Sequence, residues 1–585
     1  MRTGISGMAA MVWAMLAAAC FDPTRQCSTN ADCVAGGTCD PGTKTCVSAG
    51  NPNDKTPPAF SLTVAAPSPR QNTPKLTERD PGSPDGGIDA FRRDETVTVT
   101  VSSTDQDVDA GSVKLRAFGI GTGPVTPLDL PLEACPPGSQ AASNPFCRQA
   151  AVPLASLRFD AFRGVVTLEA TGSDLSNNVG SAAAGVNVTR WKWRYSAGAP
   201  IYTTPAIADD GTIVFGTSDG GSGSLYALTP AGAEKWAPVD LGPIKASPVI
   251  GTQDGGQQLA YVATAAQSGK LFALVIQDGG TGAECTNGGG GYPGPFLGTP
   301  ALVSSGSGPF EGVLGLANAA NLVNIRPAAG VSPCLTNDTF DSQSFPSNVV
   351  ALGSEAYLGT TVGHVVPFIL LSGNWVQNTT WSGGLGYSPV GRGPIEPLLI
   401  EPPWVVGTTS LRGIFAVDKS TGGLQANSPD AGLSADPGGP VLTADGYTFG
   451  GGAEIPPSLY SASSTLGSSS FVLLPEPLVG TPAAGSGGLL YLGTIRGSLE
   501  CRRGASNPVW SASLGPGESF LGSPTIACGI GSAASLGILY IGSVSGGLFA
   551  ALVDSPGLSA TAPWPKYQHD ARNTGNATTP IQPCP

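Results

Sequence analysis

Apolar and polar residues alternate along the first part of the chain in the pattern of β-strands. Residues 95–101 read ETVTVTV, and similar short segments (VKLRAF, GVVTLEA and GVNVTRWKWRY) continue to residue 195. A period of two places one face of each segment against a core and the other in water. We therefore expect a β-sandwich over residues 91–189.

From residue 190 onward the apolar segments recur as a repeat. The segment TTPAIADDGTIVFGTSDGGSGSLYAL shows one unit, with a proline-containing strand start, a turn, an apolar strand ending in glycine, and a further apolar strand. The proline anchors of the units are Pro205, Pro248, Pro300, Pro389, Pro440, Pro482 and Pro524, and the 89-residue gap after Pro300 leaves room for one extra unit. The second strands then start at Phe215, Tyr261, Val313, Tyr357, Trp404, Tyr447, Tyr491 and Tyr540.

Repeats of this length with several short strands predict an all-β propeller of seven or eight blades over residues 190–576. Each sheet has two apolar faces and can bury both only between neighbours, so a closed ring also protects the sheet edges. An open solenoid is disfavoured because no terminal repeat looks like a cap. We expect residues 191–195 to complete the last blade by pairing next to residues 548–553.

The repeats resemble those of the pyrroloquinoline-quinone-like (PQQ-like) propeller family. The resemblance is carried by YIGSVSGGLFAAL, LYALTPAGAEKW and FAVDKSTGG, and by the tail segment WPKYQHDARNTGN at residues 564–576. It implies a β-propeller fold. Many members bind no quinone, so it implies little about function.

The preceding region resembles bacterial immunoglobulin-like domains through SSTDQDVDAGSV and TGSDLSNNVGSA. Asp105, Asp107 and Asp109 have the spacing of the first half of a calcium loop, but Gly111 is one place late and Arg116 stands where a bidentate glutamate is needed. A solvated turn is the favoured interpretation, and we expect no metal site.

The N-terminus has the layout of an export signal. Arg2 precedes an apolar run from Met8 to Ala19, which is shorter than the roughly 20 residues of a membrane span. Small residues lead to Cys20, and this resembles a bacterial lipoprotein signal, although Leu16 lies four residues before the cysteine rather than three. The resemblance implies lipid attachment at Cys20, with ordinary secretion as the alternative.

The cysteines favour an oxidising compartment. Cys27, Cys33, Cys39 and Cys46 lie in a short segment without a core, where two disulfides could form in any of three pairings. A metal site is disfavoured there, since no CxxC and no nearby histidine is present. Cys135 and Cys147 close a short loop and are expected to pair, whereas the partners of the later cysteines stay open. The expected order is a signal peptide (1–19), a lipid-anchored four-cysteine module (20–47), a linker (48–90), the immunoglobulin-like sandwich (91–189), the propeller (190–576) and a C-terminal tail (577–585).

Composition agrees with a turn-rich β protein and narrows the partners. Glycine (83) and proline (53) are too frequent for long helices, and charged residues make up only 12% of the chain. The net charge of −13 disfavours nucleic acid as a partner.

The sequence offers little catalytic chemistry. It has no adjacent cysteines and no CxxCH haem motif, and nothing places a nucleophile beside either of its two histidines, His364 and His569. We expect His364 to be packed or at a strand end and His569 to make a structural hydrogen bond. We predict no catalytic, cofactor-binding or metal-ligating residue and no enzyme activity.

The sequence therefore predicts a non-catalytic lipoprotein of the bacterial cell envelope, with the outer membrane as the expected location. Its propeller would bind or scaffold a protein partner. The alternatives are a quinoprotein oxidoreductase and a carbohydrate-binding or adhesive surface protein.

Overall fold

A computed structural model describes residues 38–39, 44, 46–47, 54–82, 89–139, 144–252, 256–277, 282–285, 292–303, 311–315, 322–325, 335–337, 345, 347–371, 374–391, 393–395, 397–409, 413–427, 438–452, 456–506, 508–530 and 533–584. The chain divides into two compact units. The N-terminal unit consists of Met1–Ser68, Glu95–Phe159 and Gly164–Val188, and the ring unit of Pro69–Asp94, Asp160–Arg163 and Thr189–Pro585.

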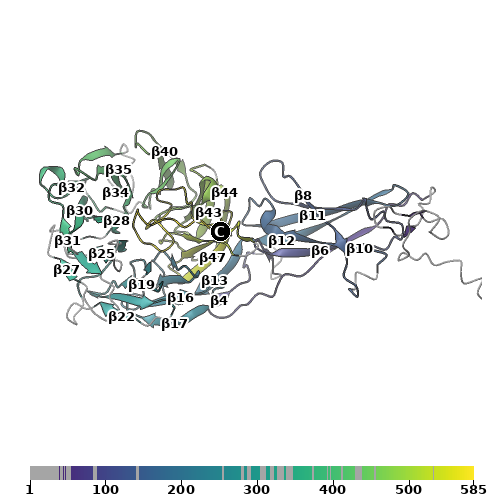
Figure 1. Cartoon of the computed structure of the whole chain (residues 1–585), viewed down its shortest axis with the longest axis horizontal. Coiled ribbons are helices and arrows are strands. Elements are labelled where there is room, and N and C mark those ends of the chain that lie inside the picture. The colour runs from purple at the N-terminus through teal and green to yellow at the C-terminus, as the bar shows by residue number, and fades with distance from the viewer. Residues whose placement is uncertain are drawn as a thin grey trace, which may run out of the picture. The chain divides into compact units, whose positions relative to one another are not determined.

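The described residues are all-β (Figure 1). Besides strands and loops they contain short 3-10 turns, among them η3 (Leu154–Ser156), η4 (Trp381–Gly383) and η5 (Ser486–Gly488). Within the ranges given above, no helix is both long and apolar enough to cross a membrane.

The N-terminal unit contains two antiparallel sheets. In spatial order, the strands of the first sheet are β3 (Phe60–Val64), β6 (Thr96–Ser103), β10 (Phe146–Pro153) and β9 (Glu133–Ala134). Those of the second are β12 (Val179–Thr189), β11 (Arg163–Ser173), β7 (Lys114–Phe118) and β8 (Leu128–Leu130). A separate two-strand sheet joins β1 (Thr38–Cys39) to β2 (Cys46–Val47).

The alternating pattern of β6 places its valines in the core. Val97, Val99 and Val101 are buried, and the intervening threonines are more exposed. The two sheets face one another, since a Cβ built on Gly172 of β11 would lie 3.0 Å from the ring of Phe60 in β3. Strand β3 falls within residues 48–90, which the sequence analysis read mostly as linker. The FSLTV alternation of β3 is short and flanked by prolines, which hides it.

The ring unit is a succession of eight antiparallel sheets within the described residues, which we number 1 to 8. Sheets 1 to 4 contain, from inner to outer strand, β14 (Ala206–Ile207), β15 (Ile213–Gly216), β16 (Ser224–Leu228) and β17 (Glu234–Asp240); β18 (Val249–Thr252), β19 (Gln258–Ala263), β21 (Leu271–Val275) and β22 (Gly282–Cys285); β24 (Ala301–Val303), β25 (Glu311–Gly315), β26 (Leu322–Ile325) and β27 (Leu335–Asn337); and β28 (Val350–Leu352), β29 (Glu355–Gly359), β30 (His364–Leu371) and β31 (Asn374–Gln377). The short strands β20 (Ser268–Gly269) and β23 (Tyr292–Pro293) pair with each other beside sheet 2.

Sheets 5 to 8 follow the same order. Their strands are β33 (Leu399–Glu401), β34 (Trp404–Thr409), β35 (Gly413–Asp418) and β36 (Leu424–Asn427); β37 (Val441–Thr443), β38 (Gly446–Gly450), β39 (Ser458–Ala462) and β40 (Ser469–Leu473); β41 (Ala483–Ala484), β42 (Leu489–Gly493), β43 (Ser498–Arg503) and β44 (Pro508–Ser513); and β45 (Thr525–Ala527), β46 (Gly537–Gly542), β47 (Gly547–Val553), β13 (Trp191–Ser196) and β4 (Leu76–Thr77). The second strand of every sheet contains the residue at which that strand was predicted to start.

The last sheet joins the two ends of the ring unit. Strand β13 pairs antiparallel with β47, so that Trp193 lies opposite Ala550 and Tyr195 opposite Leu548. This confirms the pairing expected for residues 191–195. Strand β4 adds to the free side of β13 and is the second strand found within the expected linker.

Hydroxyl groups on the inner strands tie neighbouring sheets together. The amide of Thr204 donates to Ser247 Oγ at 2.9 Å, and the amide of Ser247 to Thr299 Oγ1 at 2.9 Å. The amide of Thr481 donates to Ser523 Oγ at 2.9 Å, and that of Ser523 to Thr204 Oγ1 at 3.1 Å. Since the last of these bonds links sheet 8 to sheet 1, the succession of sheets returns to its start.

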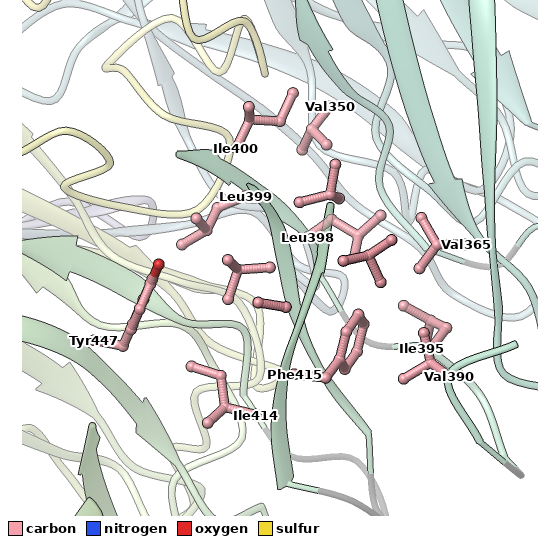
Figure 2. Close-up of a cluster of buried hydrophobic side chains, with 14 of the residues drawn as sticks. Val350, Val365, Val390, Ile395, Leu398, Leu399, Ile400, Ile414, Phe415 and Tyr447 are labelled. Carbon is pink, nitrogen blue, oxygen red and sulfur yellow. The ribbon is translucent and has the colours of Figure 1, made fainter. Parts of the chain in front are cut away.

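The remaining neighbours are joined by backbone contacts and by apolar packing. The amide of Val349 donates to the Thr299 carbonyl at 2.9 Å, and the amide of Leu398 to Asn348 Oδ1 at 2.8 Å. Figure 2 shows the hydrophobic cluster shared by sheets 4, 5 and 6, whose members include Val350, Leu399, Ile400, Phe415 and Tyr447. A smaller cluster of Val441, Ala484 and Leu490 joins sheets 6 and 7. The expected β-propeller is therefore confirmed as a ring of sheets packed face to face.

One predicted anchor is wrong. Pro389 lies in β32 (Ser388–Pro389), which pairs with the third strand of sheet 4, and not in an inner strand. The inner strand of sheet 5 follows Leu398, and that of sheet 4 follows Val349, so these residues occupy the anchor position. Proline is favoured at the anchor position but is not required. Because two units lack it, the spacing of the prolines did not locate the inner strands of these units.

Candidate functional site

The C-terminal segment 564–576, which we call the plug, lies along the inner strands of the ring. Backbone amides of six inner strands donate to its carbonyl groups at 2.6–2.9 Å. The donors and their acceptors are Ile207 to Ala571, Ile250 to Arg572, Leu302 to Thr574, Ala351 to Gly575, Leu442 to Trp564 and Ala484 to Pro565. Each donor stands two positions after the anchor of its repeat. Inner strands are sheet edges whose amides need partners, and the plug supplies them.

Two amide side chains of the plug extend this recognition. Asn573 Nδ2 donates to the carbonyls of Thr204 and Pro248, both at 3.0 Å. Gln568 Nε2 donates to the Pro300 carbonyl at 2.9 Å, and its Oε1 accepts from Asn348 Nδ2 at 2.8 Å. Both side chains are buried, and the three bonds that they donate also spare backbone carbonyls the cost of lying unpartnered.

A buried lysine organises the turn of the plug. The Lys566 side chain has no exposed surface, and its Nζ donates to the carbonyls of Tyr567 at 2.5 Å and Asp570 at 3.0 Å and to Asn573 Oδ1. Burial lowers the pKa of Lys566 to about 7, and the charge of Asp570 partly opposes this shift. Three donated bonds use all three N–H groups of the ammonium form, so the nitrogen is held by acceptors of its own turn and is not free to act as a base or nucleophile.

Asp570 and its neighbours complete the turn. The Arg572 amide donates to Asp570 Oδ1 at 2.8 Å, and the Thr574 hydroxyl donates to Oδ2. Burial alone would raise the pKa of Asp570, but the His569 ring and the Thr574 hydroxyl outweigh it and lower that pKa. Gln568, His569 and Asn573 all have positive φ angles, so the backbone is held in this conformation by its partners.

Each of the two histidines packs against an aromatic ring. His569 Nδ1 lies 3.7 Å from Asp570 Oδ2, beyond hydrogen-bond range, and its ring packs on Trp564 at 4.8 Å. The structural hydrogen bond expected of His569 is not made by Nδ1, which has no partner among the described residues, and the ring packs on Trp564. His364 is the first residue of β30 and stacks on Tyr387 at 4.1 Å, as expected for a packed strand end.

A disulfide ties the end of the chain to sheet 8. Cys528, next to β45, bonds to Cys584 across a Cα–Cα distance of 5.3 Å. A Cβ on Gly557 would lie 2.2 Å from Cys584 Sγ, so only glycine leaves room for the bridge. This pair cannot be predicted from the sequence, because 56 residues separate the two cysteines and no local pattern marks either of them.

The other cysteines follow the sequence prediction where they are described. Cys135 and Cys147 form the expected disulfide, with Cα atoms 5.6 Å apart. Cys39 is disulfide-bonded and lies opposite Cys46 in the small sheet of β1 and β2. Cys20, Cys27 and Cys33 lie outside the described residues. Cys501 is a free, buried thiol, and its burial raises its pKa to about 12.

Three carboxylates of the N-terminal unit come together. Oxygen atoms of Asp54, Asp107 and Asp174 lie within 4.8 Å of one another. Burial and the neighbouring carboxylates, Asp174 first, raise the pKa of Asp107. Asp174 is buried but accepts bonds from the Ser176 and Asn178 amides, both at 2.8 Å. These oxygens could serve as cation ligands. The grouping differs from the Asp105, Asp107 and Asp109 turn considered from the sequence, since the fold adds Asp54 and Asp174 instead.

The comparisons with known proteins add limited information. No family model matches the sequence. No curated protein sequence matches it either. Among solved structures, the chain is similar to the computationally designed Ika8 protein, with 14% identity and a TM-score of 0.45 over 61% of this chain and 98% of that chain. It is also similar to BamB from Moraxella catarrhalis, with 13% identity and a TM-score of 0.41 over 62% of this chain and 96% of that chain. Neither likeness bears on function.

Proposed function

We propose that this protein is a non-catalytic lipoprotein of the cell envelope whose eight-bladed, PQQ-like propeller is a binding or scaffolding platform. In this proposal residues 1–19 are a signal peptide and Cys20 carries the lipid. The N-terminal unit is an immunoglobulin-like spacer, and a protein partner binds the ring unit. The outer membrane is the proposed location.

The plug is the observation that carries the non-catalytic part. Its carbonyls satisfy the amides of six inner strands, and the buried side chains of Lys566, Gln568 and Asn573 are used in bonds to those strands or within its own turn. A cofactor on the axis at these strands would have to displace a segment that is bonded to sheets 1 to 4, 6 and 7. Such displacement would leave many buried groups unpartnered, which costs free energy for each of them.

The platform part is supported by the way in which the ring is built. Adjacent sheets bury their apolar faces against each other, so the loops that connect strands are left to carry surface function. The acidic net charge of −13 favours a protein partner over nucleic acid or an anionic membrane surface.

Two experiments test this proposal. In the first, the purified full chain is mixed with pyrroloquinoline quinone and calcium, and absorbance and dye reduction are recorded. We expect neither a saturable spectral change nor turnover, and a stoichiometric chromophore would establish the oxidoreductase alternative instead.

In the second, the tagged full chain is cross-linked in cells and purified from envelope fractions. We expect a defined protein partner and co-sedimentation with membranes. Cys20→Ala should release the chain from the membrane fraction, whereas the control Cys501→Ser, at a buried free thiol, should not. Recovery of glycans without a protein partner would favour the carbohydrate-binding alternative.

A further inference from the structure

A pocket opens where the first and last sheets of the ring unit meet. It has a volume of about 680 Å³ and is lined by β14 and the turn after it, by β45 and β46, and by residues 580–584 at the chain end. This volume lies within the roughly 300–1,000 Å³ range of pockets that bind small molecules.

The part of the lining that a ligand can reach is largely apolar. Ile530 is 65% exposed, and Ala527 and Ile581 are partly exposed. Pro580 and Pro583 are exposed and extend this apolar surface along the chain end. An apolar ring system would therefore gain free energy by leaving water for the pocket.

The charged groups of the lining leave one carboxylate without a counter-charge. Asp210 pairs with Lys235 at 2.5 Å. The side chains of Arg572 and Asp570 carry opposite charges, and the Arg572 amide also donates to Asp570 Oδ1 at 2.8 Å. The Asp209 carboxylate is exposed and forms neither an ion pair nor a hydrogen bond with any residue that the structure describes. The lining therefore keeps one net negative charge.

The turn that carries Asp209 is fixed by hydrogen bonds. The Asp209 amide donates to Gln258 Oε1 at 3.0 Å, and the Gly211 amide donates to the Ala208 carbonyl at 2.9 Å. Because the backbone around Asp209 is bonded, its carboxylate stays beside the apolar lining.

The opposite wall is held in place covalently. Residues 580–584 line one side of the pocket, and the Cys528–Cys584 disulfide fixes them to the loop after β45. A pocket whose walls are fixed before binding loses little conformational freedom when a ligand enters.

We propose that this pocket binds a small organic monocation, with an apolar ring system against the isoleucine and proline side chains and one ammonium group beside Asp209. An uncharged ligand of the same shape would leave the carboxylate without a counter-charge, and an anionic ligand would be repelled by it. This inference goes beyond the platform function, because it needs no macromolecular partner.

Three naphthalene derivatives of similar size test the proposal, because they differ mainly in charge. They are 1-naphthylmethylammonium, which is positively charged at pH 7, the neutral 1-naphthylmethanol and the anionic 1-naphthylacetate. Isothermal titration calorimetry of the full chain should show saturable binding of the ammonium compound at one site per chain. We expect the alcohol to bind about fivefold more weakly, which corresponds to the loss of one exposed ion pair, and the acetate to bind more weakly still.

A pair of matched variants assigns the charge preference to one residue. Asp209→Asn should abolish the preference for the ammonium compound and leave the affinity for the alcohol unchanged. Asp445→Asn is the control, because Asp445 is an exposed carboxylate in the corresponding turn of sheet 6 and does not line the pocket. It should bind all three compounds as the wild type does.

A third variant tests the apolar part of the site. Ala527 is half-buried in the pocket lining, and Ala527→Phe should fill the space and abolish saturable binding of the ammonium compound and the alcohol. The proposal is overturned if the wild type shows no saturable binding of the ammonium compound or binds the alcohol as tightly. It is also overturned if Asp445→Asn weakens binding as much as Asp209→Asn does, or if Ala527→Phe binds as the wild type does.

Discussion

Sheet 6 of the ring unit has four strands and sheet 8 has five, and the two sheets are completed in different ways. Sheet 6 is made of consecutive strands between Val441 and Leu473. Sheet 8 takes three strands from near the C-terminus and two, β13 and β4, from much earlier in the chain. Sheet 8 must offset a larger loss of chain entropy, because its strands come from distant parts of the sequence. The side chains of its outer strands show which contacts offset this loss.

The outer strands carry the difference. In β13, Trp191, Trp193 and Tyr195 are at most 2% exposed, and β4 covers the free edge. In β40 of sheet 6, Phe471 is 59% and Leu473 60% exposed. The comparison teaches that a locally formed sheet can tolerate an open apolar edge, whereas the sheet that closes the ring buries the apolar side chains of β13.

The largest expected effect is at the closing strand. Trp193→Ala should lower the free energy of unfolding of the ring unit by about 3–5 kcal/mol, because it removes a buried indole and leaves a cavity. Urea unfolding followed by intrinsic fluorescence measures this loss. A loss below about 1 kcal/mol would break the comparison, since β13 would then contribute no more than an exposed edge.

The disulfide at sheet 8 should rank next. Replacing Cys528 and Cys584 by serine opens a 56-residue loop, for which chain entropy predicts a loss of about 4 kcal/mol. The matched control replaces Cys135 and Cys147, whose 12-residue loop predicts about 3 kcal/mol. Thermal unfolding should assign each loss to its own unit, and an unchanged ring transition after the first replacement would contradict the role given to the tail.

A change in the plug should have a smaller effect on the free energy of unfolding, and this effect should depend on pH. The plug follows sheet 8 in the chain and bonds to sheet 6 through Trp564. The folded pKa of Lys566 is about 7, below its unfolded value, so above pH 7 the unfolded chain binds more protons than the folded chain. Unfolding free energy should therefore rise from pH 7 to pH 9, by up to about 1.4 kcal/mol per pH unit. The raised pKa of Cys501 acts in the opposite direction from about pH 8, where an unfolded thiol begins to ionise, and the raised pKa values of the buried tyrosines do so from about pH 9.

Denaturant melts at pH 7, 8 and 9 measure this slope. Lys566→Met should flatten it, and the control Lys419→Met, at a half-buried lysine paired with Glu355, should leave it unchanged. An identical slope in Lys566→Met would show that the titrating group lies elsewhere.

The smallest effect is expected at the open edge of sheet 6. Phe471→Ser should change the unfolding free energy by less than about 1 kcal/mol, because most of the phenyl group of Phe471 is already exposed to water. It should also reduce self-association at high concentration, which light scattering detects. A loss as large as that of Trp193→Ala would mean that the two outer strands are equivalent after all.

Much of the ring could be predicted from sequence because its repeats carry local information. The aromatic-to-glycine second strands mark positions that sterics and burial demand in every unit, and the WKWRY segment marks the strand that completes the last sheet. Pro389 was wrongly predicted as an anchor because it lies in another short strand, β32. No local sequence feature distinguishes such a strand from an inner strand.

The candidate site could be predicted only in part. The tail segment 564–576 was recognised as part of the repeat family, but its bonds to six inner strands depend on closure of the ring. The Cys528–Cys584 pair, strand β4 and the meeting of Asp54 with Asp107 and Asp174 arise from long-range contacts that no local pattern encodes.

The central claim is that the chain's own C-terminal segment occupies the inner edge of the ring. Hydrogen–deuterium exchange of the full chain tests this claim most directly. We predict that residues 564–576 and the inner-strand amides of Ile207, Ile250 and Leu302 exchange as slowly as the second strands of the sheets. Exchange of residues 564–576 within seconds, while the second strands stay protected, would contradict the account.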